Sequence, residues 1–65
     1  MLNSIKTEQW YRNIKTQKRY KVIAIAKHSE TEELMVVYGK ITQNLDLDIW
    51  VRPLELFKEK FEELN

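Results

Sequence analysis

The chain has 65 residues, 43% of them hydrophobic, with no cysteine and a net charge of +1. This length allows a single domain, residues 1–65, with a small core, because a chain of about this size buries only roughly 60% of its unfolded surface. The composition excludes disulfides and thiolate metal ligands, and no apolar run approaches the roughly 20 residues of a membrane helix. We therefore expect a cytoplasmic domain that has no membrane partner and holds no cofactor.

The charges are unevenly distributed along the chain. Residues 1–27 contain seven basic residues and one acidic residue, a net charge of +6, whereas residues 28–65 contain four basic and nine acidic residues, a net charge of −5. Such an asymmetry indicates a surface for nucleic acid or for a protein partner. The two halves can also interleave in a folded domain, and their charges then cancel.

The chain begins with a polar segment and a short alternating strand. Residues 1–9 are mainly polar, so we expect a loose arm there. Residues 10–14 alternate between two faces, which predicts a strand with Trp10 on one side and Tyr11 on the other. Residues 15–18 are polar and short enough to connect this strand to the next.

A β-hairpin is predicted at the centre of the chain. Its arms are residues 19–27 and 34–38, which are short, rich in Val, Ile and Tyr, and bounded by polar residues. The polar segment 28–33 connects the arms. On the first arm we expect Ile23 and Ile25 on one face and the smaller Val and Ala residues on the other, an alternation typical of the tapering interior of a small barrel.

The second half of the chain is predicted to bend, add a strand and end in a helix. Gly39, the only glycine, marks a bulge or a sharp bend. Residues 43–48 form a loop before a strand at residues 49–52. Pro53 suits the first turn of a helix, and apolar residues then recur at helical spacing, which predicts an amphipathic helix over residues 53–64. These apolar residues are Leu54, Phe57, Phe61 and Leu64.

Three stretches carry a family resemblance. They read YRNIK at residues 11–15, AKHSET at residues 26–31 leading to VVY at residues 36–38, and WVRPLELF at residues 50–57. In this order and spacing they resemble a family of short bacterial domains, domain of unknown function 1653, over residues 10–57. The family name carries no activity with it.

The resemblance implies a compact SH3-like β-barrel, with one helical turn and then a strand after the Arg-Pro motif. The residues themselves favour a continuous helix, because a strand would place Glu59 between Phe57 and Phe61 on one face. This chain also departs from the family at residues 13–16, where it has Asn-Ile-Lys-Thr in place of His-Tyr-Lys-Gly.

Together these patterns predict a mostly β fold. We expect a small SH3-like β-barrel of four to five antiparallel strands with a C-terminal helical segment. The single domain then consists of the loose arm 1–9, a family-like core 10–57 and a C-terminal segment 58–65.

Neither a catalytic nor a metal site is predicted. His28, Ser29 and Glu30 have the residue types of a hydrolytic triad, but adjacent side chains on an extended chain point to opposite sides. The alternative is a structured hairpin loop, in which Ser29 or Thr31 caps backbone amides and His28 forms a hydrogen bond. The carboxylates lack the tight Asp/Asn/Gly loop of a calcium site. We therefore expect no enzyme.

Non-catalytic recognition of a protein or peptide partner is the first functional hypothesis. The aromatic, cationic and polar residues near the hairpin loop and the last strand would form its surface. They are Tyr11, His28, Ser29, Glu30, Thr31, Trp50 and Arg52. The alternative for this group is structural: Arg52 stacks on an aromatic ring or pairs with a loop acid such as Glu30, which fixes the loop to the last strand.

Nucleic-acid binding is the second hypothesis. Basic residues are interleaved with the aromatic residues Trp10, Tyr11 and Tyr20, as on platforms where rings stack on bases and cations follow the phosphates. These basic residues are Arg12, Lys15, Lys18, Arg19 and Lys21. In the alternative interpretation Trp10 and Tyr20 belong to the core and the lysines form a solvated face. A small enzyme or metabolite sensor is the third and least favoured hypothesis, and the sequence leaves the oligomeric state open.

Overall fold

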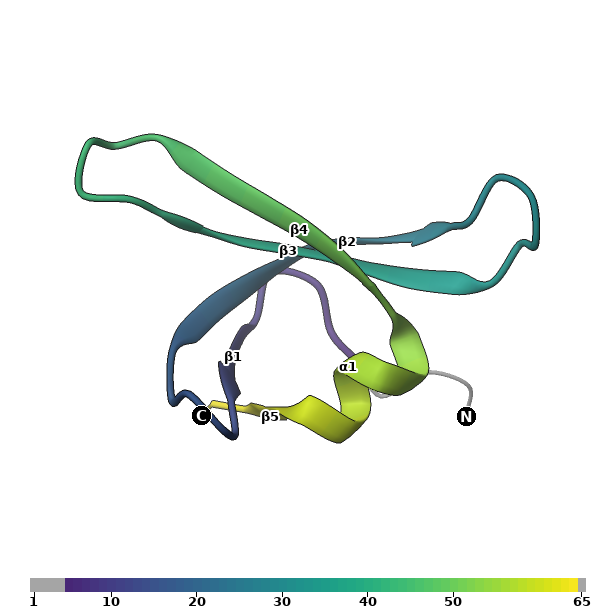
Figure 1. Cartoon of the computed structure of the whole chain (residues 1–65), viewed down its shortest axis with the longest axis horizontal. Coiled ribbons are helices and arrows are strands. Elements are labelled where there is room, and N and C mark those ends of the chain that lie inside the picture. The colour runs from purple at the N-terminus through teal and green to yellow at the C-terminus, as the bar shows by residue number, and fades with distance from the viewer. Residues whose placement is uncertain (1–4, 65) are drawn as a thin grey trace.

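The computed structural model describes residues 5–64, which form one antiparallel sheet of five strands and a short helix (Figure 1). The elements are β1 (Trp10–Asn13), β2 (Arg19–Lys27), β3 (Leu34–Ile41), β4 (Leu47–Pro53), α1 (Leu54–Lys60) and β5 (Phe61–Glu63). The strand order is β4-β3-β2-β1-β5. The first four strands therefore pair with their neighbours in sequence, and β5 returns to pair with β1.

The predicted mostly β fold with a C-terminal helical segment is confirmed, whereas closure into a barrel is not. In the part of the chain that the structure describes, β4 and β5 lie at opposite edges and no ladder joins them. The sheet is therefore open. No helix among residues 5–64 is long and apolar enough to cross a membrane.

The central hairpin lies where the sequence predicted it. Strands β2 and β3 pair from Lys27↔Leu34 at the loop to Lys21↔Gly39 at the far end, and residues 28–33 connect them. In Figure 1 this loop projects well beyond the helix.

A β-bulge in β2 reverses the predicted faces of this strand. Val22 pairs with Tyr38, but the next pair is Ala24↔Val37, so Ile23 is an extra residue without an opposite partner. The bulge brings Val22 and Ile25 to the same side of the sheet, where Val22 is fully buried and Ile25 packs against the core. The prediction that Ile23 and Ile25 share a face is therefore wrong, because an alternation of period two does not continue through a bulge.

Gly39 serves close strand packing rather than a bulge. Strand β3 continues through Gly39 in unbroken register with both neighbours. A Cβ atom at this position would lie 2.4 Å from the backbone oxygen of Asp48 on β4. The glycine therefore allows β3 and β4 to approach closely, and the bulge expected here lies in β2 instead.

The core lies between one face of the sheet, the inner face, and helix α1. Its centre is aromatic: the Phe57 and Phe61 rings stack with centroids 4.2 Å apart, and the Tyr38 ring lies 5.2 Å from each. Such ring contacts stabilise a core beyond the area that they bury. The buried residues are Ile5, Tyr11, Val22, Val36, Tyr38, Leu54, Phe57 and Phe61.

The C-terminal helix is shorter than predicted. It covers Leu54–Lys60 and is followed by β5, which pairs with β1 through Asn13↔Phe61 and Tyr11↔Glu63. The prediction of a helix as far as residue 64 is wrong after Lys60, because the backbone there completes the ladder along the edge of β1. Glu59 stays in the helix, so the strand does not place it between the two phenylalanines.

The N-terminal segment is held against the sheet rather than loose. The backbone N–H of Glu8 donates to the carbonyl of Val22 at 2.8 Å, and the N–H of Val22 donates to the carbonyl of Gln9 at 3.0 Å. Ile5 is part of the core. The expected loose arm is therefore wrong for residues 5–9, and residues 1–4 lie outside the described part.

The loop before β4 is tighter than predicted, and β4 begins at Leu47. The N–H of Thr42 donates to the carbonyl of Asp46 at 2.7 Å, and the Thr42 hydroxyl accepts from the N–H of Asp46 at 3.1 Å. Leu45 has the left-handed backbone conformation in this turn, with φ 64°. Two residues of the expected loop thus belong to the strand.

We expect Gly39→Ala to destabilise the fold by about 1–3 kcal/mol, because the backbone of β4 must move to accept the new methyl group. Thermal unfolding should then occur roughly 5–20 °C lower in temperature. Gln43→Ala, in the exposed loop, is the control and should change the free energy of unfolding by less than about 0.5 kcal/mol. Equal melting temperatures for Gly39→Ala and the wild type would contradict the close approach of β3 and β4.

Candidate binding surface

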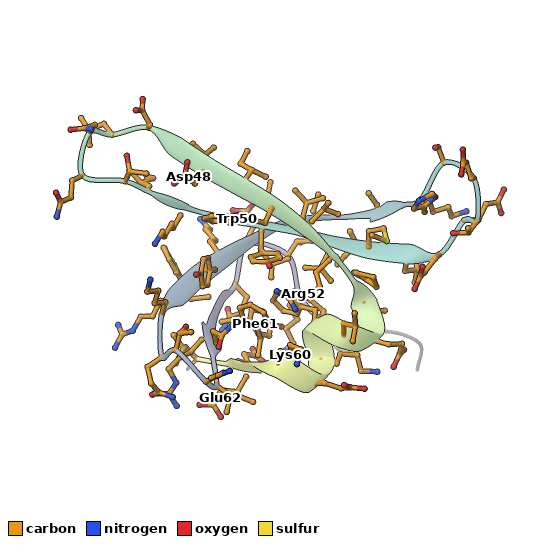
Figure 2. The ribbon with its side chains drawn as sticks, in the orientation of Figure 1. Asp48, Trp50, Arg52, Lys60, Phe61 and Glu62 are labelled. Atoms are coloured by element: carbon orange, nitrogen blue, oxygen red, sulfur yellow. The ribbon has the colours of Figure 1, made fainter. Side chains whose placement is uncertain are left out.

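Strand β4 presents two different rows of side chains. Asp48, Trp50 and Arg52 project to the inner face, because they lie opposite Lys40, Tyr38 and Val36 of β3. Figure 2 shows these three residues following one another along β4. The alternate residues project to the other side, the outer face. They are Leu47, Ile49 and Val51.

Trp50 packs against the aromatic core from β4. Its ring centroid lies 5.5 Å from that of Tyr20 and 6.1 Å from that of Tyr38. The residue is nevertheless 41% exposed. Trp50 therefore packs on the core with one part of its ring and offers the rest to solvent.

Arg52 is anchored to the core by its guanidinium. Its Nε donates to the hydroxyl of Tyr38 at 3.3 Å, and its Cζ lies 5.7 Å from the centroid of the Phe61 ring. Among the described residues, no carboxylate forms an ion pair with Arg52. The hypothetical internal pair with Glu30 is therefore absent, and an aromatic contact takes its place.

The hairpin loop is organised by its own side chains. His28 Nδ1 accepts from the backbone N–H groups of Glu30 at 3.1 Å and Thr31 at 3.4 Å. The Thr31 hydroxyl accepts from the N–H of Glu33 at 3.1 Å. Within residues 5–64, no hydrogen bond joins Ser29 to His28. The geometry is that of a structured loop, and His28 is not positioned to act as a base toward Ser29.

The predicted surface residues are not brought together into one site. Within the described part, no hydrogen bond, salt bridge or ring contact connects the loop residues His28–Thr31 to Trp50 or Arg52. Tyr11 is 2% exposed, its ring lies 5.4 Å from that of Phe57, and its hydroxyl accepts from the N–H of Lys6 at 2.9 Å. Tyr11 thus belongs to the core, because its side chain lies on the inner face of the sheet and packs against the helix.

The predicted basic surface is partly neutralised. Arg12 forms a salt bridge with Glu62 on β5, and Lys21 Nζ lies 3.2 Å from a carboxylate oxygen of Glu8. Glu62 lies on β5, distant in sequence, and Glu8 lies just before β1. The sequence alone did not show that these two acids lie beside the basic residues. The three remaining cations are exposed and form no salt bridge with any described residue. They are Lys15, Lys18 and Arg19.

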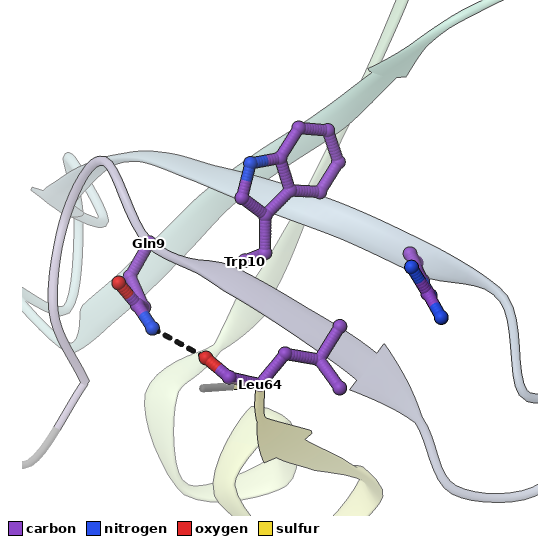
Figure 3. A pocket seen from close by; sticks show the side chains of 4 residues that line it. Gln9, Trp10 and Leu64 are labelled. Atoms are coloured by element: carbon purple, nitrogen blue, oxygen red, sulfur yellow. Dashed lines mark hydrogen bonds between the residues drawn. The ribbon is translucent and has the colours of Figure 1, made fainter.

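Arg19 lies in a shallow groove of about 540 Å³ that is also lined by Gln9, Trp10 and Leu64 (Figure 3). The amide of Gln9 closes one end by donating from Nε2 to the carbonyl of Leu64 at 2.6 Å. Trp10 is 47% exposed. The interpretation of Trp10 as core is therefore wrong, because its neighbour Tyr11 occupies the inward position of β1.

The outer face of the sheet is apolar, a feature that the sequence analysis missed. Its exposed apolar side chains come from four strands. They are Trp10, Ile23, Ile41, Leu47, Ile49 and Val51. The alternation of Leu47, Ile49 and Val51 with polar or aromatic residues is a signal in the sequence that could have located this face on β4.

The two edges of the sheet differ in protection. β5 has three residues, of which Glu62 and Glu63 are held in salt bridges with Arg12 and Lys6. β4 has seven residues, and Leu47–Val51 are all exposed. In the described part of the chain, β4 pairs with β3 and has no neighbour on its other side. A long, apolar and unpaired edge is a template for another strand.

Side chains for metal binding do not gather anywhere in residues 5–64. No group of three or more histidine or carboxylate residues is placed there to hold a metal ion.

Comparison with known proteins gives one match. A family model described as protein of unknown function (DUF1653) matches residues 8–64. Neither the curated proteins nor the solved structures contain a significant match.

We expect Arg52→Ala to lower the free energy of unfolding by about 1–2 kcal/mol, because the variant loses a hydrogen bond to Tyr38 and the cation–π contact with Phe61. Chemical denaturation measures this loss. In a Tyr38→Phe background the same substitution should cost less, since the hydroxyl acceptor is already absent. Glu30→Ala is the control and should change stability by less than about 0.5 kcal/mol. Equal losses for Glu30→Ala and Arg52→Ala would instead indicate a pair between the loop and β4.

Proposed function

The chain belongs to the family of proteins of unknown function DUF1653, and we propose that it is a non-catalytic binding module whose edge strand β4 recognises an extended segment of a protein partner. The strand order, with a helix just before the last strand, also supports the SH3-like arrangement that the resemblance implies. Since fold does not define function, the proposal depends on β4 itself.

The contrast between the two edges carries this proposal. Proteins protect sheet edges with short strands and charged side chains, and β5 has both. β4 is long and exposed, and its apolar residues Leu47, Ile49 and Val51 are each more than half exposed. An added strand would pair with the backbone of β4 and cover these side chains.

The side chains of β4 offer selectivity in addition to backbone pairing. A segment added beside β4 contacts the exposed part of Trp50 on the inner face and the apolar row on the outer face. Trp and Arg are the residues most enriched where binding energy is concentrated. Trp50 and Arg52 are already ordered by the aromatic core, so little conformational entropy is lost when a partner binds.

The loop His28–Thr31 keeps a structural role in this proposal. Its hydrogen bonds end the β2–β3 hairpin and do not turn a reactive group toward β4. Among the described residues of this loop, no nucleophile is in contact with a base, as a hydrolytic mechanism would require. The binding proposal requires neither group. We place the module in the cytoplasm, as the cysteine-free sequence led us to expect.

A single-stranded nucleic acid is the second candidate ligand, and one observation favours it. The exposed indole of Trp10 shares a groove with Arg19, which directly follows the β1–β2 loop, and Lys15 and Lys18 of this loop form no salt bridge with any described residue. Base stacking on an exposed ring beside cations is the usual arrangement of such sites. It ranks second because Arg12 and Lys21 are neutralised by carboxylates.

Random heptapeptides displayed on phage and selected against the protein provide a test of the binding proposal, since seven residues match the length of β4. We expect selected peptides to shift the NMR amide signals of β4 and to slow the hydrogen exchange of its outward amides. Ile49→Lys and Val51→Lys should each weaken binding by about tenfold or more, because they place charge on the apolar row.

Leu56→Lys is the matched control for these variants. It introduces the same charge at an exposed apolar residue of α1, away from the edge, and should leave peptide affinity unchanged. Peptides that shift only the loop at residues 28–33 or the β1–β2 loop would contradict recognition by β4.

A short single-stranded oligonucleotide tests the second candidate. If it binds, amide shifts should cluster around Lys15, Lys18 and Arg19, include the Trp10 indole, and fall sharply between about 50 and 200 mM salt. Lys18→Ala should weaken binding, whereas Lys58→Ala on α1 should have no effect. The absence of shifts at the lower salt concentration would remove this candidate.

A further inference from the structure

We propose that the segment recognised by β4 is β4 of a second copy of this chain, paired antiparallel about a two-fold axis at Trp50. This inference rests on the proposed function, because it names the occupant of the same edge. The product is a symmetric dimer in which the two sheets become one continuous sheet. Such an interface is isologous, so the same strand must be complementary to itself.

The alternation of side chains limits the register of such a pair. Residues directly opposite each other in an antiparallel pair project to the same face. A two-fold axis between two residues would oppose an inner residue to an outer one, so the axis must pass through a residue. An axis at Trp50 aligns the whole of β4, Leu47–Pro53, because Trp50 is its central residue. An axis at Ile49 or Val51 would leave residues at one end unpaired.

The charges of β4 become complementary in this register. An axis at Trp50 places Asp48 opposite Arg52 of the second copy, and the symmetry forms this pair twice. Within residues 5–64 neither side chain has an ion-pair partner. The hydrogen bond to Tyr38 uses only Nε of Arg52, and its two terminal amino groups remain available for a carboxylate.

The apolar side chains are also complementary in the same register. On the outer face, Ile49 lies opposite Val51 of the second copy, and these residues are 52% and 59% exposed in the single chain. On the inner face, Trp50 lies opposite its own counterpart. Cross-strand pairs of aromatic and β-branched residues stabilise antiparallel ladders. Pro53 lacks an N–H donor, but it occurs only in the terminal pair with Leu47.

Analytical ultracentrifugation of the full chain tests the dimer, at concentrations from about 1 µM to 1 mM. Asp48→Arg and Arg52→Asp should each raise the dimer dissociation constant by about tenfold or more, because each places like charges opposite each other twice. An equimolar mixture of the two variants should dimerise again, since each then meets the opposite charge. Asp46→Arg, with the same change of charge in the loop before β4, is the control and should dimerise like the wild type.

A cysteine at the two-fold axis tests the register without altering the charges of β4. The chain has no cysteine, so Trp50→Cys introduces a single thiol that lies opposite itself. Cα atoms of opposed residues in an antiparallel pair are about 4.5–5.5 Å apart, within the range of a disulfide. Oxidised glutathione should therefore produce a covalent dimer of Trp50→Cys. Val51→Cys is the matched control and should cross-link poorly, because its thiol lies opposite Ile49 of the second copy.

The outcomes separate this inference from the proposed function. A chain that stays monomeric at the highest concentration but binds heptapeptides along β4 overturns the second copy as occupant and leaves β4 as the binding site. A dimer that is insensitive to both charge reversals, or that cross-links equally through Val51→Cys, overturns the register. The absence of both dimer and peptide binding overturns both proposals.

Discussion

The stacked pair of Phe57 and Phe61 is the contact on which the rest of the structure depends. The two rings, with centroids 4.2 Å apart, join the helix to the last strand and lie beside Tyr38 of β3. Without cysteine, the chain holds its small core together through such contacts. They also direct the C-terminal segment beneath the sheet to β1. β5 therefore protects the edge of β1, and β4 is left as the open edge.

The bulge at Ile23 determines which side chains of β2 face the core and which face outward. Because of the bulge, Val22 and Ile25 both face the core although they are three positions apart in a nine-residue strand. Ile23 is left on the outer face, the same face as the apolar row of β4. The apolar row of β4 on the outer face is therefore separate from the buried aromatic cluster, whereas Trp50 and Arg52 on the inner face pack against that cluster.

The sequence predicts the elements that depend on local patterns and misses those that depend on distant pairing. The central hairpin and the start of the helix after Pro53 follow from strand composition and from the fixed backbone of proline. Phe61 was assigned to the helix because a spacing of four residues fits both a longer helix and a strand that turns inward. Tyr11 and Arg12 were assigned to surfaces because their partners, Phe57 and Glu62, lie about fifty residues away. For Trp50 and Arg52, the sequence located the right strand and predicted aromatic stacking of the arginine as one alternative, but it did not identify Phe61 and Tyr38 as the partners.

The pairing of β5 with β1 also determines the order in which the sheet can form. The β2–β3 hairpin closes a short loop, whereas the β1–β5 ladder joins residues such as Arg12 and Glu62, which are 50 positions apart. Closing a long loop costs more entropy, and distant contacts slow folding, so we expect this ladder to form late. Until it does, β1 is a second unpaired edge. A newly synthesised chain is therefore most exposed to faulty association in the interval before β5 reaches the sheet.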